Sequence, residues 1–275
     1  MERPPSSAME CWWERPSEIL PSPRGWPGGL VDGLMVGICT LAVTVLLELL
    51  SLDAVRDIVR KDARLYRQAV VANLSNNLVL GPLIYCGGVN LFAARERRPA
   101  AESLAVGVCM TLGHAVGANA APRGHDAAHR CVSVGYYAAH RAMHTKRLFW
   151  MHAFHHRFNR LVCPVAANAV SHWEYTFAYM APFFVLIPFF RPDARAVVFA
   201  GSSVSLGNLL IHAPPLAAAS ARLPAFCCST AAHLAHHREY QTNFGASTLK
   251  FDAVLRSCPP LDRAVDRAFL RILGK

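Results

Sequence analysis

The stretch from Tyr136 to Arg157 reads YYAAHRAMHTKRLFWMHAFHHR and carries five histidines. Ten of the thirteen histidines of the chain lie between residues 140 and 237, and eight of them form three short boxes: His140-x3-His144, His152-x2-His155-His156 and His233-x2-His236-His237. Positions i, i+3 and i+4 of an α-helix share one face, so each box directs two or three imidazoles to one place. Eight imidazoles are too many for one ion, so the pattern predicts a pair of metal ions.

The first two boxes cannot lie on one straight helix if they bind the same ions. From His140 to His156 such a helix rises about 24 Å, whereas two metal ions in a shared site lie about 3.5–4 Å apart. No Gly or Pro interrupts this stretch, and the geometry still predicts a break around residues 145–147. Neutral imidazole suits zinc, copper, iron and nickel alike. So many histidines beside an apolar cavity favour iron, because structural zinc sites usually close with four ligands.

The composition indicates an integral membrane protein of one main domain. The 275 residues are 53% hydrophobic, and the mean hydropathy is +0.24. The net charge of +10 comes from Lys and Arg that are scattered among apolar spans, which favours contact with anionic lipid head groups and argues against nucleic-acid binding. The nine cysteines include no C-x2-C pair, so neither a disulfide framework nor a thiolate zinc site is expected.

The chain predicts several membrane-embedded stretches, because a run of about 20 apolar residues crosses a bilayer core. These are Leu30 to Leu52, Ala69 to Phe92, Ser103 to Ala120, and a tilted or re-entrant hairpin formed by Thr176 to Phe190 and Ala196 to Ile211. Four asparagines of the second stretch should face other helices: Asn73, Asn76, Asn77 and Asn90.

The basic stretch Arg56 to Arg67 is expected to be cytosolic by the positive-inside rule. Three crossings before His140 then place all histidine boxes on the cytosolic side, although Arg95, Arg97 and Arg98 conflict with that count. The predicted fold class is an all-α integral membrane helical bundle with a cytosolic-side, histidine-rich two-metal cap.

Four segments make up the predicted organisation: a flexible tail 1–26, transmembrane helices 27–125, a catalytic domain 126–257 that includes the membrane hairpin 176–211, and a C-terminal tail 258–275. The tail 1–26 lacks an apolar signal core, so no cleavable signal peptide is expected. Its tryptophans, Trp12, Trp13 and Trp26, are expected to meet the membrane surface.

The order of the boxes, with a hydrophobic hairpin before the last, resembles the fatty acid hydroxylase/sterol desaturase superfamily of membrane-bound non-haem diiron enzymes. Further matches are Tyr137 and Arg141 around the first box, Thr145-Lys146 after it, Asn243-Phe244-Gly245 after the last box, and then Phe251-Asp252. The resemblance covers about Tyr136 to Ser257. Membrane acyl desaturases have a much longer segment between the first two boxes, where this chain has seven residues.

The resemblance adds His172 and His212 to the eight box histidines as metal ligands, although the family's His-Pro-x-Glu segment here reads His172-Trp-Glu174. Four further residues are expected to support catalysis around the ligands: Glu174, Tyr137, Asp252 and Asn243. His125-x3-His129 imitates the first box but lacks its context, and His114 is expected to be structural.

The resemblance implies a diiron enzyme that uses O2, and electrons from NAD(P)H through cytochrome b5 or its reductase, to hydroxylate or desaturate a lipid in the endoplasmic reticulum. A sterol or sterol precursor is the first expected substrate; fatty-acyl or sphingolipid hydroxylation and squalene-type epoxidation are alternatives. No nucleotide-binding motif is evident, so electrons are expected from a partner. Two rivals of other classes are a membrane protein with structural zinc and a divalent-metal transporter; histidines clustered beside the membrane argue against the transporter.

Overall fold

The computed structural model describes residues 28–92, 98–116, 135–245 and 250–256, with short pieces beyond. Within these ranges the secondary structure is helical and contains no β-strand, so the all-α prediction is confirmed. The predictions for the tail 1–26, for His125 and His129, and for Arg95 and Arg97 lie outside the described residues.

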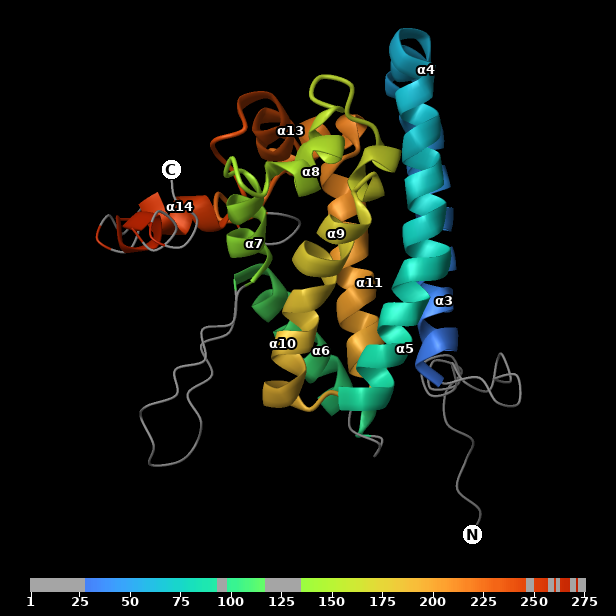
Figure 1. Cartoon of the computed structure of the whole chain (residues 1–275), viewed down its shortest axis with the longest axis vertical. Helices are drawn as coiled ribbons and strands as arrows, with labels where there is room; N and C mark the ends of the chain where they lie inside the picture. The colour runs from blue at the N-terminus through green and yellow to red at the C-terminus, as the bar shows by residue number, and fades with distance from the viewer. Residues whose placement is uncertain are drawn as a thin grey trace.

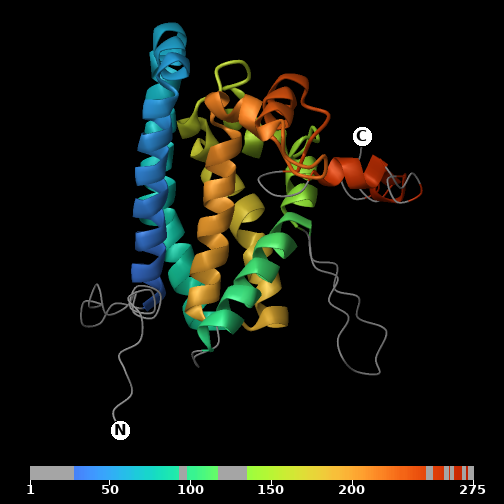
Figure 2. The same cartoon turned by 180° about the vertical axis from the view of Figure 1, so that it is seen from behind.

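Long helices run side by side between the two ends of the molecule (Figures 1 and 2). Helix α3 (Gly28–Leu50) turns at Ser51 into α4 (Leu52–Ser75), which continues through the π-helical η1 (Asn76–Leu80) into α5 (Gly81–Phe92). Helix α6 (Ala100–Val116) runs back toward the end at which α3 meets α4. Three helical stretches are long and apolar enough to cross a membrane: Gly29–Leu50, Leu52–Gly88 and Ala194–Ile211.

The hairpin before the last histidine box extends between the two ends of the bundle. Its first arm joins α9 (His172–Glu174), η3 (Tyr175–Met180) and α10 (Ala181–Phe190), and its second arm is α11 (Ala194–Ile211). Polar residues at the start of the first arm continue the helix, so this arm is longer than the apolar run alone predicts. Arg191 turns the chain with a left-handed φ of 42°, and Asp193 caps α11 by accepting a hydrogen bond from the amide of Ala196 at 3.0 Å.

Two glycines allow the helices of the bundle to approach closely. A Cβ on Gly37 of α3 would lie 1.9 Å from the carbonyl oxygen of Asn77, and one on Gly201 of α11 would lie 1.5 Å from the hydroxyl of Tyr85. Small residues at such contacts are a usual means of helix packing in membranes. These contacts bring α3 against η1, and α11 against α5.

Buried and half-buried polar side chains of α3, α4 and η1 hold the segment that follows the second histidine box. Asn73 donates from Nδ2 to the carbonyl of Val165 at 2.7 Å, and Asn76 donates to the carbonyl of Val170 at 3.1 Å. Glu48 accepts a hydrogen bond from the amide of Val165 at 2.7 Å. The prediction that the asparagine amides face protein is confirmed for Asn73, Asn76 and Asn77, all buried; the side chain of Asn90 lies outside the described residues.

The helices with the histidine boxes lie at one end of the bundle. They are α7 (Tyr136–Met143), α8 (Phe149–His156) and α13 (Thr230–Glu239), and the basic first half of α4 projects at the same end (Figure 1). The count of membrane crossings in the sequence predicted that all histidine boxes lie on one side of the membrane, and the structure places their helices at one end. Arg98, Arg191 and Asp193 lie at the opposite end, where Arg98 donates to the carbonyl of Arg191.

Candidate metal centre

Short helices with defined ends bring the three boxes together. Helix α7 ends at Met143, the hydroxyl of Thr145 donates to the carbonyl of Ala142 at 2.7 Å, and α8 begins at Phe149. The predicted helix break at residues 145–147 is therefore confirmed. Helix α13 begins after Ser229, whose side chain accepts a hydrogen bond from the amide of Ala232 at 3.2 Å.

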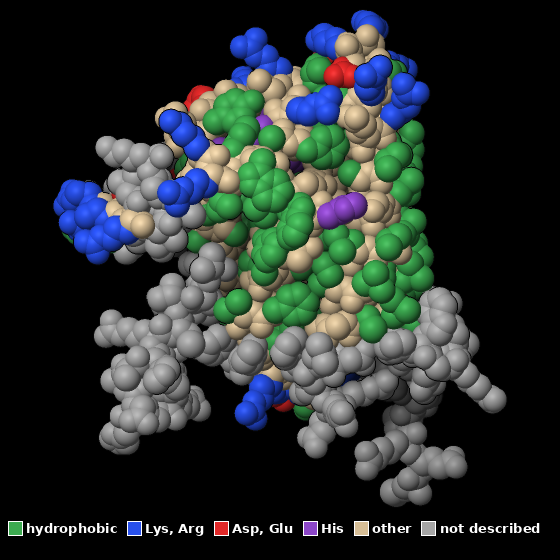
Figure 3. Space-filling view, viewed as in Figure 1, with side chains coloured by type: hydrophobic (Ala, Val, Ile, Leu, Met, Phe, Trp, Pro, Cys, Tyr) green, Lys and Arg blue, Asp and Glu red, His purple; other side chains and the backbone are tan. Residues whose placement is uncertain are grey.

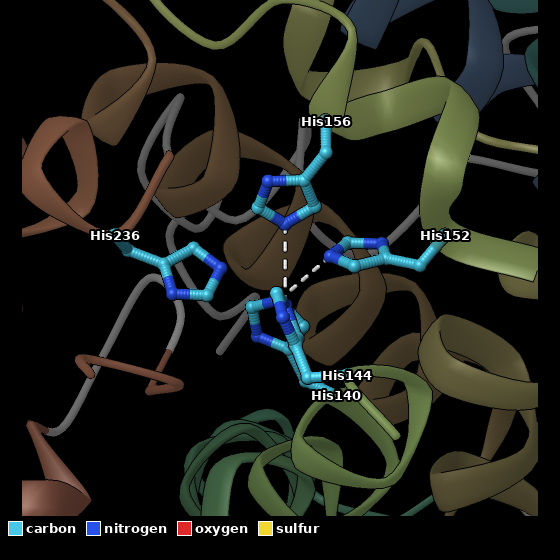
Figure 4. A group of neighbouring side chains, drawn as sticks. All are labelled: His140, His144, His152, His156 and His236. Atoms are coloured by element: carbon cyan, nitrogen blue, oxygen red, sulfur yellow. Dashed lines mark hydrogen bonds between the residues drawn. The ribbon is translucent and has the colours of Figure 1, made fainter. Parts of the chain in front are cut away.

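Nine histidines converge in two groups, and within each group the ligand nitrogens lie within 4.8 Å of one another. The first group, drawn in Figure 4, is His140, His144, His152, His156 and His236. The second group is His155, His212, His233 and His237. All of these side chains are buried except His144, which is half-buried. The two groups lie close together, with the rings of His156 and His237 centred 5.1 Å apart.

The second and third boxes each serve both groups, in opposite ways. In the second box the i, i+4 pair His152 and His156 belongs to the first group, and the intervening His155 points to the second. In the third box the i, i+4 pair belongs to the second group, and the intervening His236 points to the first. Helices α8 and α13 therefore each contribute ligands to both groups, whereas the first box, on α7 and its C-terminal end, contributes ligands only to the first group.

Main-chain carbonyls fix which nitrogen of three imidazoles carries the proton. Nδ1 of His140 donates to the carbonyl of Phe244 at 2.8 Å, Nδ1 of His236 to that of Thr242 at 2.7 Å, and Nδ1 of His212 to that of Asn208 at 2.7 Å. A carbonyl can only accept, so in each neutral ring the proton lies on Nδ1 and Nε2 presents a lone pair. It is Nε2 that points into the group.

The converging Nε2 atoms fit a metal ion in each group. Nε2 of His140 lies 2.9 Å from Nε2 of His152, and Nε2 of His212 lies 2.9 Å from Nε2 of His233. Nε2 of His236 is buried and has no hydrogen-bond partner among the described residues. A buried lone pair without a donor is costly, and a cation bound between the rings satisfies several such lone pairs at once. The prediction of a pair of metal sites agrees with this donor set.

The histidines are electrostatically suited to metal binding because burial keeps them neutral. Burial, with the nearby His236, lowers the pKa of His144 to about 3 and the pKa of His156 to about 2. The pKa of His140 falls well below its usual value for the same reason. At neutral pH these rings are therefore neutral, with one N–H and one lone pair each, which is the form that binds a metal ion.

Glu174 supports the first group directly. Its carboxylate is fully buried, and Oε1 lies 2.7 Å from Nδ1 of His152. A ligating imidazole usually donates its second N–H to such a group, which orients the ring and raises its basicity. Ser171 holds Glu174 in place, because its hydroxyl accepts from the amide of Glu174 at 3.1 Å and donates to the carbonyl of Met151.

The other three expected supporting residues surround the segment 242–245, whose carbonyls hold His140 and His236. Asp252 on α14 (Phe251–Arg256) accepts from the amide of Gly245 at 3.2 Å. Asn243 has a left-handed φ of 58°, and its side chain donates to the hydroxyl of Thr242. The hydroxyl of Tyr137 accepts from Arg141 at 3.0 Å, and its ring packs edge-on against Phe244. These contacts act on the imidazoles through the main chain.

His172 does not join either group. Its side chain is exposed, and Nε2 lies 3.1 Å from the hydroxyl of Ser75. Residues two apart on a helix differ by about 200° in direction, so a turn that directs Glu174 inward directs His172 outward. His114 is buried against Phe183 and hydrogen-bonds to the carbonyl of Tyr179, as expected for a structural residue.

Two aromatic residues beside the first group were not anticipated from the sequence. The ring of Tyr240 is centred 4.5 Å from that of His156, and Phe149 lies 6.0 Å from His144. Neither belongs to a box or a matched motif, so only their proximity along the chain to the histidines could have suggested them. With Phe244, centred 5.1 Å from His144, they surround the half-buried side of the group.

An all-helical membrane bundle that carries two buried groups of convergent histidines at one end defines a histidine-rich membrane metalloprotein. Residues 128–257 match the sequence model of the fatty acid hydroxylase family. Within this region, a little under half of the chain, the protein is similar to that family and to the superfamily that its motifs resemble. No curated protein and no solved structure matches it. The match indicates an oxidoreductase of a family that acts on lipids in a membrane.

Proposed function

We propose that the chain is a diiron oxygenase that uses O2 to hydroxylate or desaturate a lipid, with a sterol or sterol precursor as the first candidate substrate. The observation that carries this proposal is the convergence of nine imidazoles in two adjacent groups. Neutral nitrogen ligands suit iron, and two iron ions would supply the reductive activation of O2 that no side chain provides. Fatty-acyl or sphingolipid hydroxylation and squalene-type epoxidation use the same kind of site and are the alternatives.

The residues of the chain would hold, orient and shield the ions. The nine ligands are neutral, so the positive charge of the ions would be offset by nearby acidic groups: the buried Glu174 acting through His152, and Asp252, whose charge acts on His236. Phe149, Tyr240 and Phe244 restrict water around His144. His144 is the ligand nearest to the surface, so the lipid would reach the first group from this side.

Electrons would come from NAD(P)H through a cytochrome b5-type carrier, because no nucleotide-binding motif is evident in the chain. The histidine-bearing end is also where many Lys and Arg side chains gather (Figure 3). Such an end fits both an acidic carrier and the cytosolic side of a membrane. We place the enzyme in the endoplasmic reticulum with this end toward the cytosol.

Metal content and turnover, measured on the same preparations, test the proposal. Protein produced with ample iron and purified in detergent should contain two iron ions per chain. His236→Ala should lower iron binding in the first group, and His233→Ala in the second, and both should abolish O2-dependent turnover. His172→Ala is the matched control, because this histidine lies outside both groups, and it should retain both ions.

The outcome also separates the rival functions. Sterols, acyl lipids and squalene are supplied in separate assays, each with a reductase and cytochrome b5. The lipid that yields an oxidised product would identify the substrate class. Bound zinc with no O2 consumption, even after iron reconstitution, would instead support a structural zinc protein. Well-folded protein that binds no metal ion would refute the enzyme assignment.

A further inference from the structure

A groove of about 650 Å³ lies between α4 and the start of α9, outside both histidine groups. Arg64, Arg67, Val71 and Ser75 line it from α4, and His172 and Trp173 line it from the opposite side. Its volume is within the range of ligand sites, roughly 300–1,000 Å³. The proposed oxygenase reaction gives this groove no role.

The α4 wall changes from cationic to apolar along its length. Arg64, Arg67, Val71 and Ser75 follow helical spacing and so share one face of α4, and from Arg64 to Ser75 this face extends about 16 Å. The arginines lie toward the histidine-bearing end, where Lys and Arg gather, and the broad apolar side of the molecule lies beyond it (Figure 3). The polar layer of a bilayer is about 5–8 Å deep on each side, so the groove is long enough to pass from head groups into hydrocarbon.

Among the described residues, none supplies a counter-charge at the cationic end of the groove. Arg56 on the same helix pairs with Asp53, and Lys61 pairs with Asp57. Arg64 and Arg67 form no ion pair with any described residue, and no acidic residue is among those that line the groove. Two free guanidinium groups one helical turn apart are suited to an anion with several oxygens, such as a phosphate.

The opposite wall presents aromatic surface to the groove and its surroundings. Trp173 is 55% exposed, and its ring stacks on Phe177 with the centroids 5.8 Å apart. Trp150, also exposed, packs edge-on against Trp173. Exposed tryptophans of membrane proteins gather at the level of the head groups, which is the depth that the arginines indicate.

We propose that this groove binds one anionic phospholipid. The phosphate lies between Arg64 and Arg67, the polar glycerol region lies along Gln68, and an acyl chain passes Val71 and Trp173 toward the apolar side. The charge, the length and the aromatic wall of the groove fit this one occupant. The proposal holds whether or not the histidine groups catalyse lipid oxidation.

Quenching of tryptophan fluorescence by brominated lipid tests the proposal in the full chain. The protein is placed in phosphatidylcholine vesicles that contain a small fraction of phosphatidylglycerol brominated on its acyl chains, or the same fraction of brominated phosphatidylcholine. The anionic lipid should quench more strongly, and Trp173→Phe should remove most of the difference. Arg64→Gln/Arg67→Gln should remove most of the preference for the anionic lipid, because it removes both guanidinium groups that line the groove.

Two further variants separate the groove from general charge and from misfolding. Arg56→Gln/Arg60→Gln removes two charges from the same helix outside the groove and should keep the preference. Val71→Phe narrows the groove without changing its charge or adding a tryptophan, and it should abolish the preference.

Equal quenching by the two lipids would overturn the proposal. Equal loss of the preference in the two arginine variants would also overturn it, because the lipid would then respond to surface charge alone. Competition by millimolar inorganic phosphate would show a site for free phosphate and would contradict a lipid site. Retention of the preference in Val71→Phe would likewise refute it.

Discussion

Replacing Glu174 by glutamine separates the charge of the carboxylate from its hydrogen bond. Glutamine is nearly isosteric and can still accept from Nδ1 of His152 through its amide oxygen, in place of the 2.7 Å contact that Glu174 makes. Burial raises the pKa of Glu174 well above its usual value, and a cation held by His152 would favour the ionised carboxylate. The variant removes the negative charge of that ionised form, which raises the basicity of His152. Changes of this kind beside metal ligands typically lower metal affinity by about 10- to 100-fold, which corresponds to about 1.4–2.7 kcal/mol.

The effect should be confined to one of the two ions. His152 belongs to the first group, and no ligand of the second group contacts Glu174 among the described hydrogen bonds. In a titration with a metal chelator, Glu174→Gln should therefore release one ion at a chelator concentration about 10- to 100-fold lower than the concentration that the unaltered protein requires. Glu174→Ala should release it more easily still, because it leaves a buried N–H of His152 without an acceptor, at a cost of about 1–3 kcal/mol.

Asp193→Asn is the matched control for this experiment. Asp193 is also a buried carboxylate, accepting from Ser103 at 2.7 Å and from the amide of Ala196 at 3.0 Å, but it lies at the opposite end of the bundle (Figure 1). Its replacement should leave both ions bound. Release of both ions together from Glu174→Gln, or equal release from Asp193→Asn, would show that the carboxylate does not act on the first group through His152.

Three other measurements test the fold and its electrostatics. In metal-free protein, burial holds the pKa of His236 at about 4, so the unfolded chain takes up a proton below about pH 6.5 that the folded chain does not. The free energy of unfolding should therefore fall between about pH 6.5 and pH 4, by up to about 1.4 kcal/mol per pH unit for this residue, and the unfolding temperature should fall with it; a constant unfolding temperature would contradict a neutral cluster. Gly201→Ala should destabilise the bundle by about 1–3 kcal/mol, because the new Cβ meets the hydroxyl of Tyr85, and Tyr85→Phe should restore part of the loss; no recovery would indicate another cause. Asn73→Ala should lower the unfolding temperature by removing the donor to Val165, at a cost of about 1–3 kcal/mol, whereas the exposed Leu74→Ala should change it little.

The sequence predicted the parts of this structure that depend on local periodicity. Apolar runs gave the first membrane helix, since α3 (Gly28–Leu50) corresponds to the run that begins at Leu30. The spacing of the boxes predicted two metal sites, and the rise of a helix predicted the break before Phe149. Each of these inferences needs only helix geometry and the cost of burying polar groups.

The division of the ligands between the two groups could not be predicted in this way. Whether His236 or His237 faces the first group depends on the rotation of α13 relative to α8, which packing between distant segments determines. The carbonyls of Thr242 and Phe244 carry no side-chain signal, although they orient His236 and His140. His172 was expected among the ligands from the resemblance alone, and the direction of α9 places it on the outer surface.

The second and third boxes each supply ligands to both groups, and this has a consequence for insertions and deletions. Removing one residue from α13 ahead of His233 turns the following histidines by about 100° and shifts them by about 1.5 Å. Because His236 serves one group while His233 and His237 serve the other, that single shift would misdirect ligands of both groups. Length changes in the connection 221–228, which precedes the cap at Ser229, leave this rotation intact. The family should therefore vary in length between its boxes and remain fixed in length within them.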